Sequence, residues 1–109
     1  AFFENLVLLE CLKHQANFGA AGELFFYRDS NHNEIDLVVE TGAITHLVEI
    51  KQTATPKAAH FDVLRRLQSV FPRSQACLAT AAPKEERLSA QLVARPWSQL
   101  AACIFPGKS

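Results

Sequence analysis

The sequence predicts a mixed α/β domain in which helices cover a central β-sheet. Three observations lead to this prediction. Residues 2–17 form a helix-prone stretch without proline or glycine, and β-branched and aromatic segments follow over residues 24–51. A second stretch with apolar residues at helical spacing then precedes a short apolar strand at residues 75–80. With 109 residues, 49% of them hydrophobic, the chain is expected to form a single domain over residues 1–109.

Two helices are predicted from residue composition and from their boundary residues. The first runs from residue 2 to Asn17, and Gly19 favours a helix C-terminus there. Its apolar residues lie around most of the helix, so we expect it to be buried on more than one side. The second begins at Thr55 and Pro56, an N-cap residue followed by proline at the first helical position, and ends near Phe71.

The predicted strands are short apolar segments bounded by turn-forming residues. They are residues 24–28, 34–40, 46–51, 75–80 and 88–94. A loop from Thr41 to Ile44 joins the second and third strands into an antiparallel hairpin. Pro96 starts a closing helical turn, in which Trp97 is expected to seal the edge of the core. The predicted order is helix, a three-stranded antiparallel meander, helix and strand, with the mixed central sheet flanked by helices.

Composition argues against several classes of protein. Eleven basic residues balance eleven acidic ones, so the chain lacks the positive field of a dedicated nucleic-acid or anionic-membrane binder. No apolar run approaches the about 20 residues that a membrane-spanning helix needs. Cys11, Cys77 and Cys103 lie in apolar surroundings and are predicted to be buried thiols of a reducing compartment. We therefore expect a cytoplasmic protein without membrane contact, and the absence of a lead-in before the first helix predicts a fragment of a longer protein.

The hairpin between the second and third strands has a defined apolar face. Because side chains alternate along a strand, Ile35, Leu37 and Val39 are predicted to share one face. Val48 and Ile50 share a face of the next strand. Only registers that place these two sets side by side make a continuous apolar surface, since a one-residue slip would separate them. The polar residues of both strands then project from the opposite face.

This register brings three ionisable residues together. Asp36, Glu49 and Lys51 emerge on one face, and the four-residue loop sets Asp36 directly across from Glu49. Their Cβ atoms would lie about 5 Å apart, where two negative charges repel unless a cation neutralises them. Mg²⁺ binds one or two carboxylates together with waters and phosphate oxygens, and Mn²⁺ is an alternative. Lys51 is then placed to orient an attacking water or to stabilise charge on a phosphate, which predicts metal-assisted phosphodiester hydrolysis.

The same residues also permit an interpretation without catalysis. In this register Glu34 faces Lys51, so the charged residues would form a cross-strand salt-bridge lattice on a solvated face. Val38 and Leu47 argue against a solvated face, because they make its centre apolar and indicate that another element covers it.

The pattern around Asp36 resembles that of a known nuclease superfamily. An acid on one hairpin strand, followed on the next by Glu49-Ile50-Lys51, is similar to the PD-(D/E)xK nucleases, and the element order agrees with their core. A closer resemblance, to the C-terminal domain of unknown function of prokaryotic AAA+-type ATPases, covers nearly the whole chain. The segments that carry it are Phe3-Glu4-Asn5, Tyr27-Arg28-Asp29, Asn33-Glu34-Ile35-Asp36-Leu37-Val38, Val48-Glu49-Ile50-Lys51 and Arg95-Pro96-Trp97.

The resemblance implies a restriction-endonuclease-like fold that acts on DNA or RNA. It implies that Glu4 reaches the metal site from the first helix as a further acidic ligand, and that Gln52 supports the site beside the lysine. Arg28, at a strand end near this face, is expected to contact a phosphate or to pair with Asp29.

The resemblance further implies an N-terminal ATPase part of the parent protein as partner. The chain itself has no Gly-x-x-x-x-Gly-Lys-Ser/Thr loop, so we do not expect it to bind ATP. The competing hypothesis is a catalytically inactive nuclease fold that binds partners or regulates the attached ATPase, because a fold does not by itself imply an activity.

Overall fold

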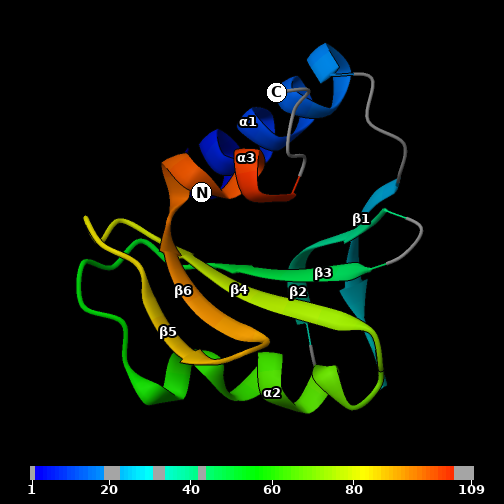
Figure 1. Ribbon diagram of the computed structural model, residues 1–109, viewed down its shortest axis with the longest axis vertical. Coiled ribbons are helices and arrows are strands. Elements are labelled where there is room, and N and C mark those ends of the chain that lie inside the picture. Colours follow the sequence, from blue (N-terminus) through cyan, green and yellow to red (C-terminus); the bar gives the residue numbers. More distant parts are fainter. Residues whose placement is uncertain (1, 19–22, 31–33, 42–43, 105–109) are drawn as a thin grey trace.

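Figure 1 shows a computed structural model of the protein, which describes residues 2–18, 23–30, 34–41 and 44–104. A six-stranded sheet lies between two layers of helices. The helices α1 (Phe2–Phe18) and α3 (Leu100–Ile104) lie on one side of the sheet, and α2 (Asp62–Gln68) lies on the other. The predicted mixed α/β fold with helices on both faces is therefore confirmed.

The sheet combines antiparallel and parallel pairs. Its strands are β1 (Glu23–Arg28), β2 (Glu34–Glu40), β3 (Thr45–Ile50), β4 (Ser74–Thr80), β5 (Glu86–Ser89) and β6 (Leu92–Pro96), in the spatial order β1-β2-β3-β4-β6-β5. The first three strands form an antiparallel meander, whereas β4 is parallel to both β3 and β6. Adjacent parallel strands need a crossover connection, and α2 with the preceding 3₁₀ helix η1 (Ala58–Phe61) forms the one between β3 and β4.

Two apolar clusters hold the layers together. One lies between the sheet and α1 and α3, and the other between the sheet and α2. Phe3, Val7 and Cys11 form the buried stripe of α1, one helical turn apart. The Phe3 ring meets Trp97 edge to face at 6.2 Å between centroids, so Trp97 packs at the core edge as predicted.

Several sequence-based predictions about the helices and the C-terminal region need correction. Helix α1 is not buried on more than one side, because its outer positions Phe2, Leu9 and Leu12 are exposed. The second helix begins at Asp62 rather than at Thr55, after η1. The single strand predicted at residues 88–94 is instead a hairpin, formed by β5, a turn at residues 90–91, and β6.

The remaining structural findings concern the cysteines and membrane contact. Cys11 and Cys77 are buried as predicted, but Cys103 is exposed on α3. No helix in the described part of the chain is long and apolar enough to cross a membrane.

Candidate metal centre

The hairpin that carries the candidate residues has the predicted alignment. Leu37 pairs with Val48, and Glu40 pairs with Thr45 at the other end of the ladder. The connection is the expected four-residue loop, closed by a 3.1 Å hydrogen bond from the Thr41 N–H to the Ile44 carbonyl. This alignment places Asp36 and Glu49 immediately beyond the last paired residues of β2 and β3.

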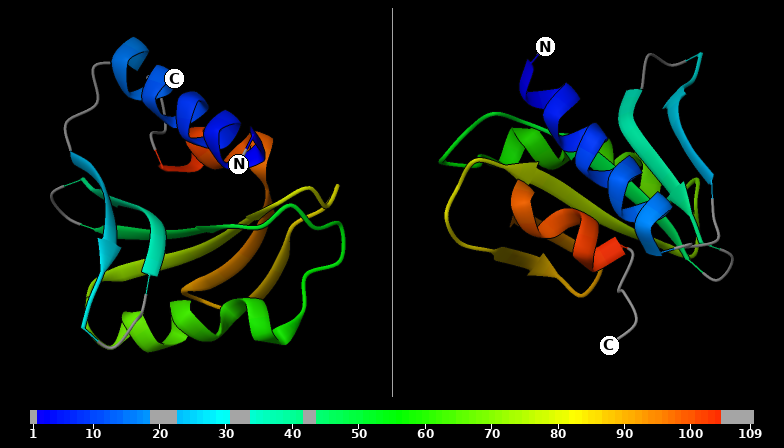
Figure 2. Two further views of the ribbon diagram at one scale, coloured as in Figure 1. Left: turned by 180° about the vertical axis from the view of Figure 1, so that it is seen from behind. Right: turned by 90° about the horizontal axis from the view of Figure 1, so that it is seen from above.

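The strand β2 is not regular at this point. Phe25 of β1 pairs with Val38, but Tyr27 pairs with Ile35, so two residues of β2 lie opposite one residue of β1. This β-bulge rotates the chain, and Ile35 packs in the same α2-facing cluster as Val38. The prediction that Ile35 shares a face with Leu37 and Val39 is therefore wrong. The strands β1 and β2 are also steeply inclined to β3, as Figures 1 and 2 show.

The bulge gives Asp36 a structural contact with the neighbouring strand. Asp36 Oδ2 accepts a 2.8 Å hydrogen bond from the backbone N–H of Ile50. The carboxylate thus takes the place of a backbone carbonyl where the pairing between β2 and β3 has ended. The sequence pattern gave no sign of this contact, because alternation assumes a regular strand and says nothing about side chains that bond to the backbone.

Glu49 lies against Asp36, and its side chain is only 12% exposed. The pKa of Glu49 is raised to about 8, first by burial, then by the charge of Asp36 and a side-chain hydrogen bond between the two carboxyl groups. The charge of Lys51 and a backbone hydrogen bond from Asp36 act in the opposite direction on this pKa. Without a cation the Glu49 carboxyl group therefore carries a proton at neutral pH.

Lys51 completes the group of three residues. Its Nζ lies 3.8 Å from Glu49 Oε2, and its side chain is 46% exposed. The Lys51 N–H donates to the Ala79 carbonyl at 2.9 Å, which continues the alignment of β3 with β4 just past the end of the strand. The structure therefore brings Asp36, Glu49 and Lys51 together, as the sequence analysis expected.

The ion pairs around the hairpin differ from the cross-strand salt-bridge lattice of the alternative interpretation. Glu34 pairs with Arg28, at 2.7 Å between Glu34 Oε1 and Arg28 Nη2, instead of facing Lys51. Asp29 accepts a 3.2 Å hydrogen bond from the Tyr27 hydroxyl. The bulge explains why Glu34 does not face Lys51, because it shifts the residues before Asp36 out of the register that simple alternation assumes.

Glu4 and Gln52 lie outside the strands that carry Asp36 and Glu49. Glu4 lies half-buried in the first turn of α1, and Gln52 is exposed after β3. Among the described residues no three His, Cys, Asp or Glu side chains gather closely enough to hold a metal ion. The roles of Glu4 and Gln52 remain predictions from the resemblance.

The donor set at Asp36 and Glu49 suits a hard divalent cation. Two adjacent carboxyl groups, one of them with a pKa raised by burial and by the charge of the other, are an arrangement that a divalent cation stabilises. Mg²⁺ is held by one or two carboxylates and completes its shell with waters and phosphate oxygens, so a third protein ligand is not required.

Fold and site together define a mixed α/β domain with a half-buried carboxylate pair and an adjacent lysine at the end of a bulged hairpin. A scan against protein families matched residues 1–100 to a family of domains of unknown function, DUF4143, and the chain belongs to this family. A search of curated protein sequences found no similar protein.

The raised pKa of Glu49 predicts how stability depends on pH in the metal-free protein. The folded state holds this proton up to about pH 8, whereas the unfolded chain releases it near pH 4.5. The free energy of unfolding should therefore fall as the pH rises from about 4.5 to 8, by at most about 1.4 kcal/mol per pH unit. Urea unfolding in EDTA at pH 5 to 9 measures this slope.

Glu49→Gln should remove this slope, because glutamine keeps the neutral shape and has no proton to lose. The variant is expected to match the wild type near pH 5 and to be more stable at pH 8. Glu86→Gln, which alters an exposed glutamate of β5, is the matched control and should follow the wild-type profile. If the free energy of unfolding depended on pH in the same way in the wild type and in Glu49→Gln, the assignment of the buried proton to Glu49 would be wrong.

Proposed function

We propose that this domain is a metal-dependent nuclease of the PD-(D/E)xK type, with a restriction-endonuclease-like core, that hydrolyses phosphodiester bonds of DNA or RNA. The observation that carries the proposal is the contact between the carboxyl groups of Asp36 and Glu49, with Lys51 3.8 Å from Glu49. The order of helices and strands, with the two acids on β2 and β3 of an antiparallel meander, supports the same proposal.

Asp36 and Glu49 would hold Mg²⁺ or Mn²⁺ between them, and Glu4 of α1, the further acid that the resemblance implies, does not gather with this pair among the described residues. The ion would supply Lewis-acid stabilisation of the phosphate and lower the pKa of an attacking water. Asp36 is held in place by the Ile50 N–H, so one ligand position is fixed before any ion binds. Glu49 must give up its proton to act as a ligand, which makes metal binding release a proton below about pH 8.

Lys51 would act on the substrate rather than on the fold. Its ammonium group is partly exposed at the edge of the carboxylate pair, where it can donate to a phosphate oxygen as negative charge develops there. In the hydrolysis a water oxygen bonds to phosphorus, the bond to one ester oxygen breaks, and the leaving oxygen takes up a proton. Arg28, with its partner Glu34 at the surface, would contact the phosphate backbone from the end of β1.

Lys51→Ala is the sharpest test of catalysis by this site. The variant should retain metal binding but cleave more slowly by a factor on the order of 10² to 10³, because one charge donor to the transition state is lost. Cleavage of single-stranded DNA, duplex DNA and RNA is followed with Mg²⁺ or Mn²⁺, with EDTA as the blank. Lys84→Ala, an exposed lysine before β5, is the matched control and should cleave like the wild type.

Cleavage that survives Lys51→Ala and Glu49→Gln combined would show that the activity comes from elsewhere. Proton release on metal binding, measured by calorimetry in buffers of different ionisation enthalpy, gives an independent readout of the carboxylate pair.

The second candidate function is a catalytically inactive module that docks a partner or regulates an attached ATPase. Phe2, Leu9 and Leu12 on α1 and Phe26 on β1 are exposed apolar side chains, and such residues are typical of contact surfaces. This function predicts no metal-dependent cleavage of any substrate, and it predicts that Phe26→Ser weakens partner binding while Lys51→Ala does not.

A further inference from the structure

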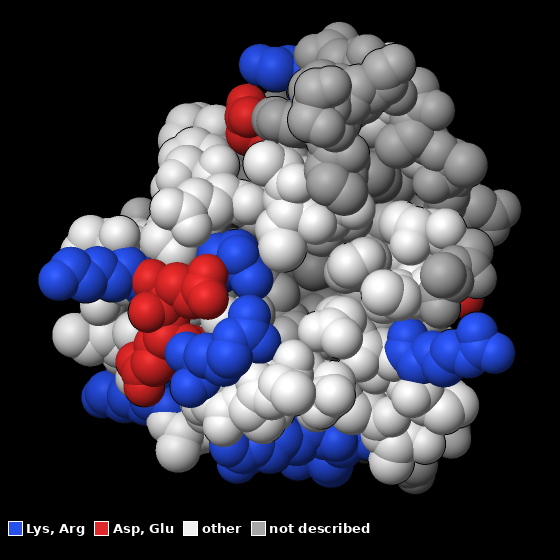
Figure 3. Space-filling view, viewed as in Figure 1, with Lys and Arg blue, Asp and Glu red and all other residues white. Residues whose placement is uncertain are grey.

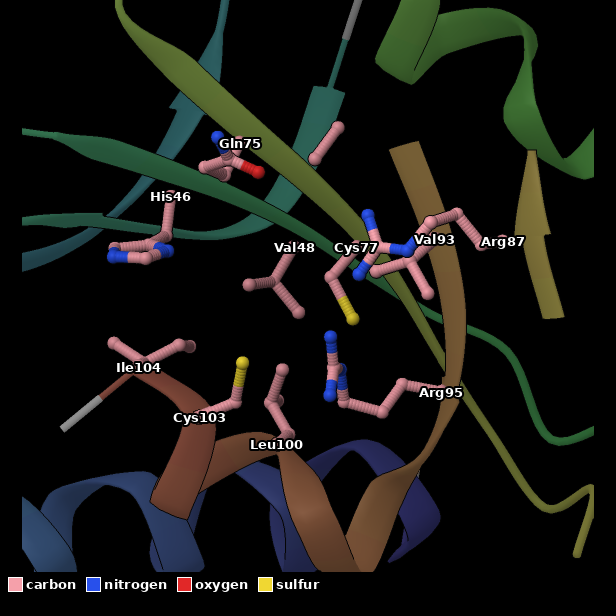
Figure 4. A pocket seen from close by; sticks show the side chains of 11 residues that line it. His46, Val48, Gln75, Cys77, Arg87, Val93, Arg95, Leu100, Cys103 and Ile104 are labelled. Carbon is pink, nitrogen blue, oxygen red and sulfur yellow. The ribbon is translucent and has the colours of Figure 1, made fainter. Parts of the chain in front are cut away.

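A cavity of about 220 Å³ lies between α3 and the sheet, on the side opposite α2. Val48 of β3, Cys77 of β4 and Val93 of β6 line it from the sheet, and Leu100 and Ile104 line it from α3. Figure 4 shows these side chains converging on one space. On the face of the molecule seen in Figure 3, charged side chains gather along one side of a hollow.

Two arginines form one end of this cavity. The guanidinium groups of Arg87 and Arg95 both point toward Cys77 (Figure 4), and the Arg95 side chain is only 14% exposed. They share a single carboxylate, because Glu85 lies 3.0 Å from Arg95 Nη1 and 3.7 Å from Arg87 Nη2. None of the described residues that line the cavity is acidic. One positive charge at this end is therefore left without a counter-charge in the cavity.

Arg95 also carries a donor without an acceptor. Within the described residues, Arg95 Nε is the one buried side-chain nitrogen or oxygen that lacks a hydrogen-bond partner. A buried unpaired donor costs about 1–3 kcal/mol, and more when it is charged. Burial raises the pKa of the neighbouring Cys77 thiol to about 12, so this group stays neutral and does not supply a negative charge.

The other end of the cavity is polar but uncharged. His46 and Gln75 lie there, away from the arginines (Figure 4). Burial lowers the pKa of His46, so its imidazole is neutral at pH 7. Between the two ends the lining is apolar, with Val48, Leu100 and Ile104 as its main contacts.

We propose that this cavity is a binding site for a small organic anion, whose carboxylate or phosphate group contacts Arg87 and Arg95 and whose apolar body lies between Val48 and Leu100. A planar guanidinium matches the oxygens of either anion, so the shared chemistry is an oxyanion on an apolar body. The volume is below the about 300–1,000 Å³ of drug-sized pockets, which favours a single-ring ligand. The site is distinct from the metal centre, because Val48 and Glu49 are consecutive on β3 and face opposite sides of the sheet.

Titration with benzoate, phenyl phosphate and the neutral benzamide tests the proposal, followed by backbone amide NMR shifts of the full chain. At least one anion should bind about tenfold tighter than benzamide, and the shifts should concentrate at Val48, Cys77 and Val93. A preference for benzoate or for phenyl phosphate then identifies the source of the oxyanion. Equal binding of benzamide, no binding of either anion, or shifts centred on α2 would overturn the proposal.

Variants distinguish anion binding in the cavity from non-specific attraction of anions to the positive charges of the protein. Arg87→Ala and Arg95→Gln should each weaken anion binding about tenfold, and Cys103→Phe should block the cavity for every ligand. Arg65→Ala removes the same charge from the exposed side of α2, and an equal loss there would refute a specific site. If Arg95→Gln does not fold, Cys103→Phe decides the matter, because Arg87 also bonds to the carbonyls of the β5–β6 turn. Asp36→Asn should bind the anion like the wild type, so this result does not depend on the metal centre.

Discussion

Replacing Asp36 by asparagine is expected to abolish metal binding and to reduce cleavage by a factor of about 10³ or more, while the fold stays intact. Asparagine keeps a carbonyl oxygen that can accept the 2.8 Å hydrogen bond from the Ile50 N–H, so the end of the hairpin retains its contact. It removes the negative charge that the proposed cation needs. The same charge raises the pKa of Glu49, so this pKa should fall toward its usual value in the variant.

Asp36→Ala separates the structural from the chemical role of this residue. It removes the acceptor as well as the charge, and it leaves the Ile50 N–H without its partner, at a cost of about 1–3 kcal/mol in unfolding free energy. Both variants should lose metal binding by calorimetry, but only the alanine variant should lose stability in urea unfolding. The comparison therefore measures what the hydrogen bond contributes to the fold, independently of the proposed metal.

Either of two results would contradict this account of Asp36. Metal binding that persists in Asp36→Asn would place the cation elsewhere in the protein. Equal destabilisation by asparagine and alanine would show that the carboxylate charge, and not the hydrogen bond to Ile50, stabilises the strand end.

The sequence was sufficient to predict the arrangement of β2 and β3. Leu37, Val39, Val48 and Ile50 form a continuous apolar face, and a loop of fixed length leaves one register that keeps this face intact. That register predicts the neighbourhood of Asp36 and Glu49 without any knowledge of the other strands. Local alternation and loop length therefore determine the candidate site to a large extent.

The bulge at Asp36 could not be predicted in the same way. A bulge depends on the pairing of β1 with β2, and β1 offers no signal of its own for the residue at which the pairing shifts. Ile35 is apolar and would be buried in a regular strand as well as in a bulged one, so its residue type does not indicate which core cluster it joins. The hydrogen bond from Ile50 to Asp36 follows from this geometry and was missed for the same reason.

The β5–β6 hairpin was missed because its turn lacks the usual residues. The turn at residues 90–91 contains neither glycine nor asparagine, which are the common hairpin signals. Arg87 Nη1 instead donates to the carbonyls of Ser89 and Ala90, and Ser89 Oγ accepts from the Gln91 N–H. Side chains thus stabilise a turn that local propensity does not predict. The arginine end of the cavity depends on this hairpin, so it could not be predicted from the sequence either.

Leu64→Ala is expected to lower the free energy of unfolding by about 2–5 kcal/mol, a large part of the about 5–15 kcal/mol that stabilises a typical domain. Leu64 is fully buried on α2, the helix that covers its face of the sheet between β3 and β4. Its removal leaves a cavity in the cluster that contains Leu47, two residues before Glu49 on β3. Urea unfolding at one fixed pH in EDTA gives the difference without a contribution from the carboxylate pair.

Leu9→Ala is the matched control, because it deletes the same atoms from a side chain that is 62% exposed on α1. The change should alter stability by no more than about 0.5 kcal/mol, since exposed leucine buries little area and alanine is an equally good helix former. A decrease in the free energy of unfolding as large as that of Leu64→Ala would mean that the outer side of α1 is buried in solution, as the apolar residues all around this helix predict. Comparing the unfolding free energies of the two variants therefore tests whether α1 is buried on one side, as in the structure, or on several sides, as its sequence pattern predicts.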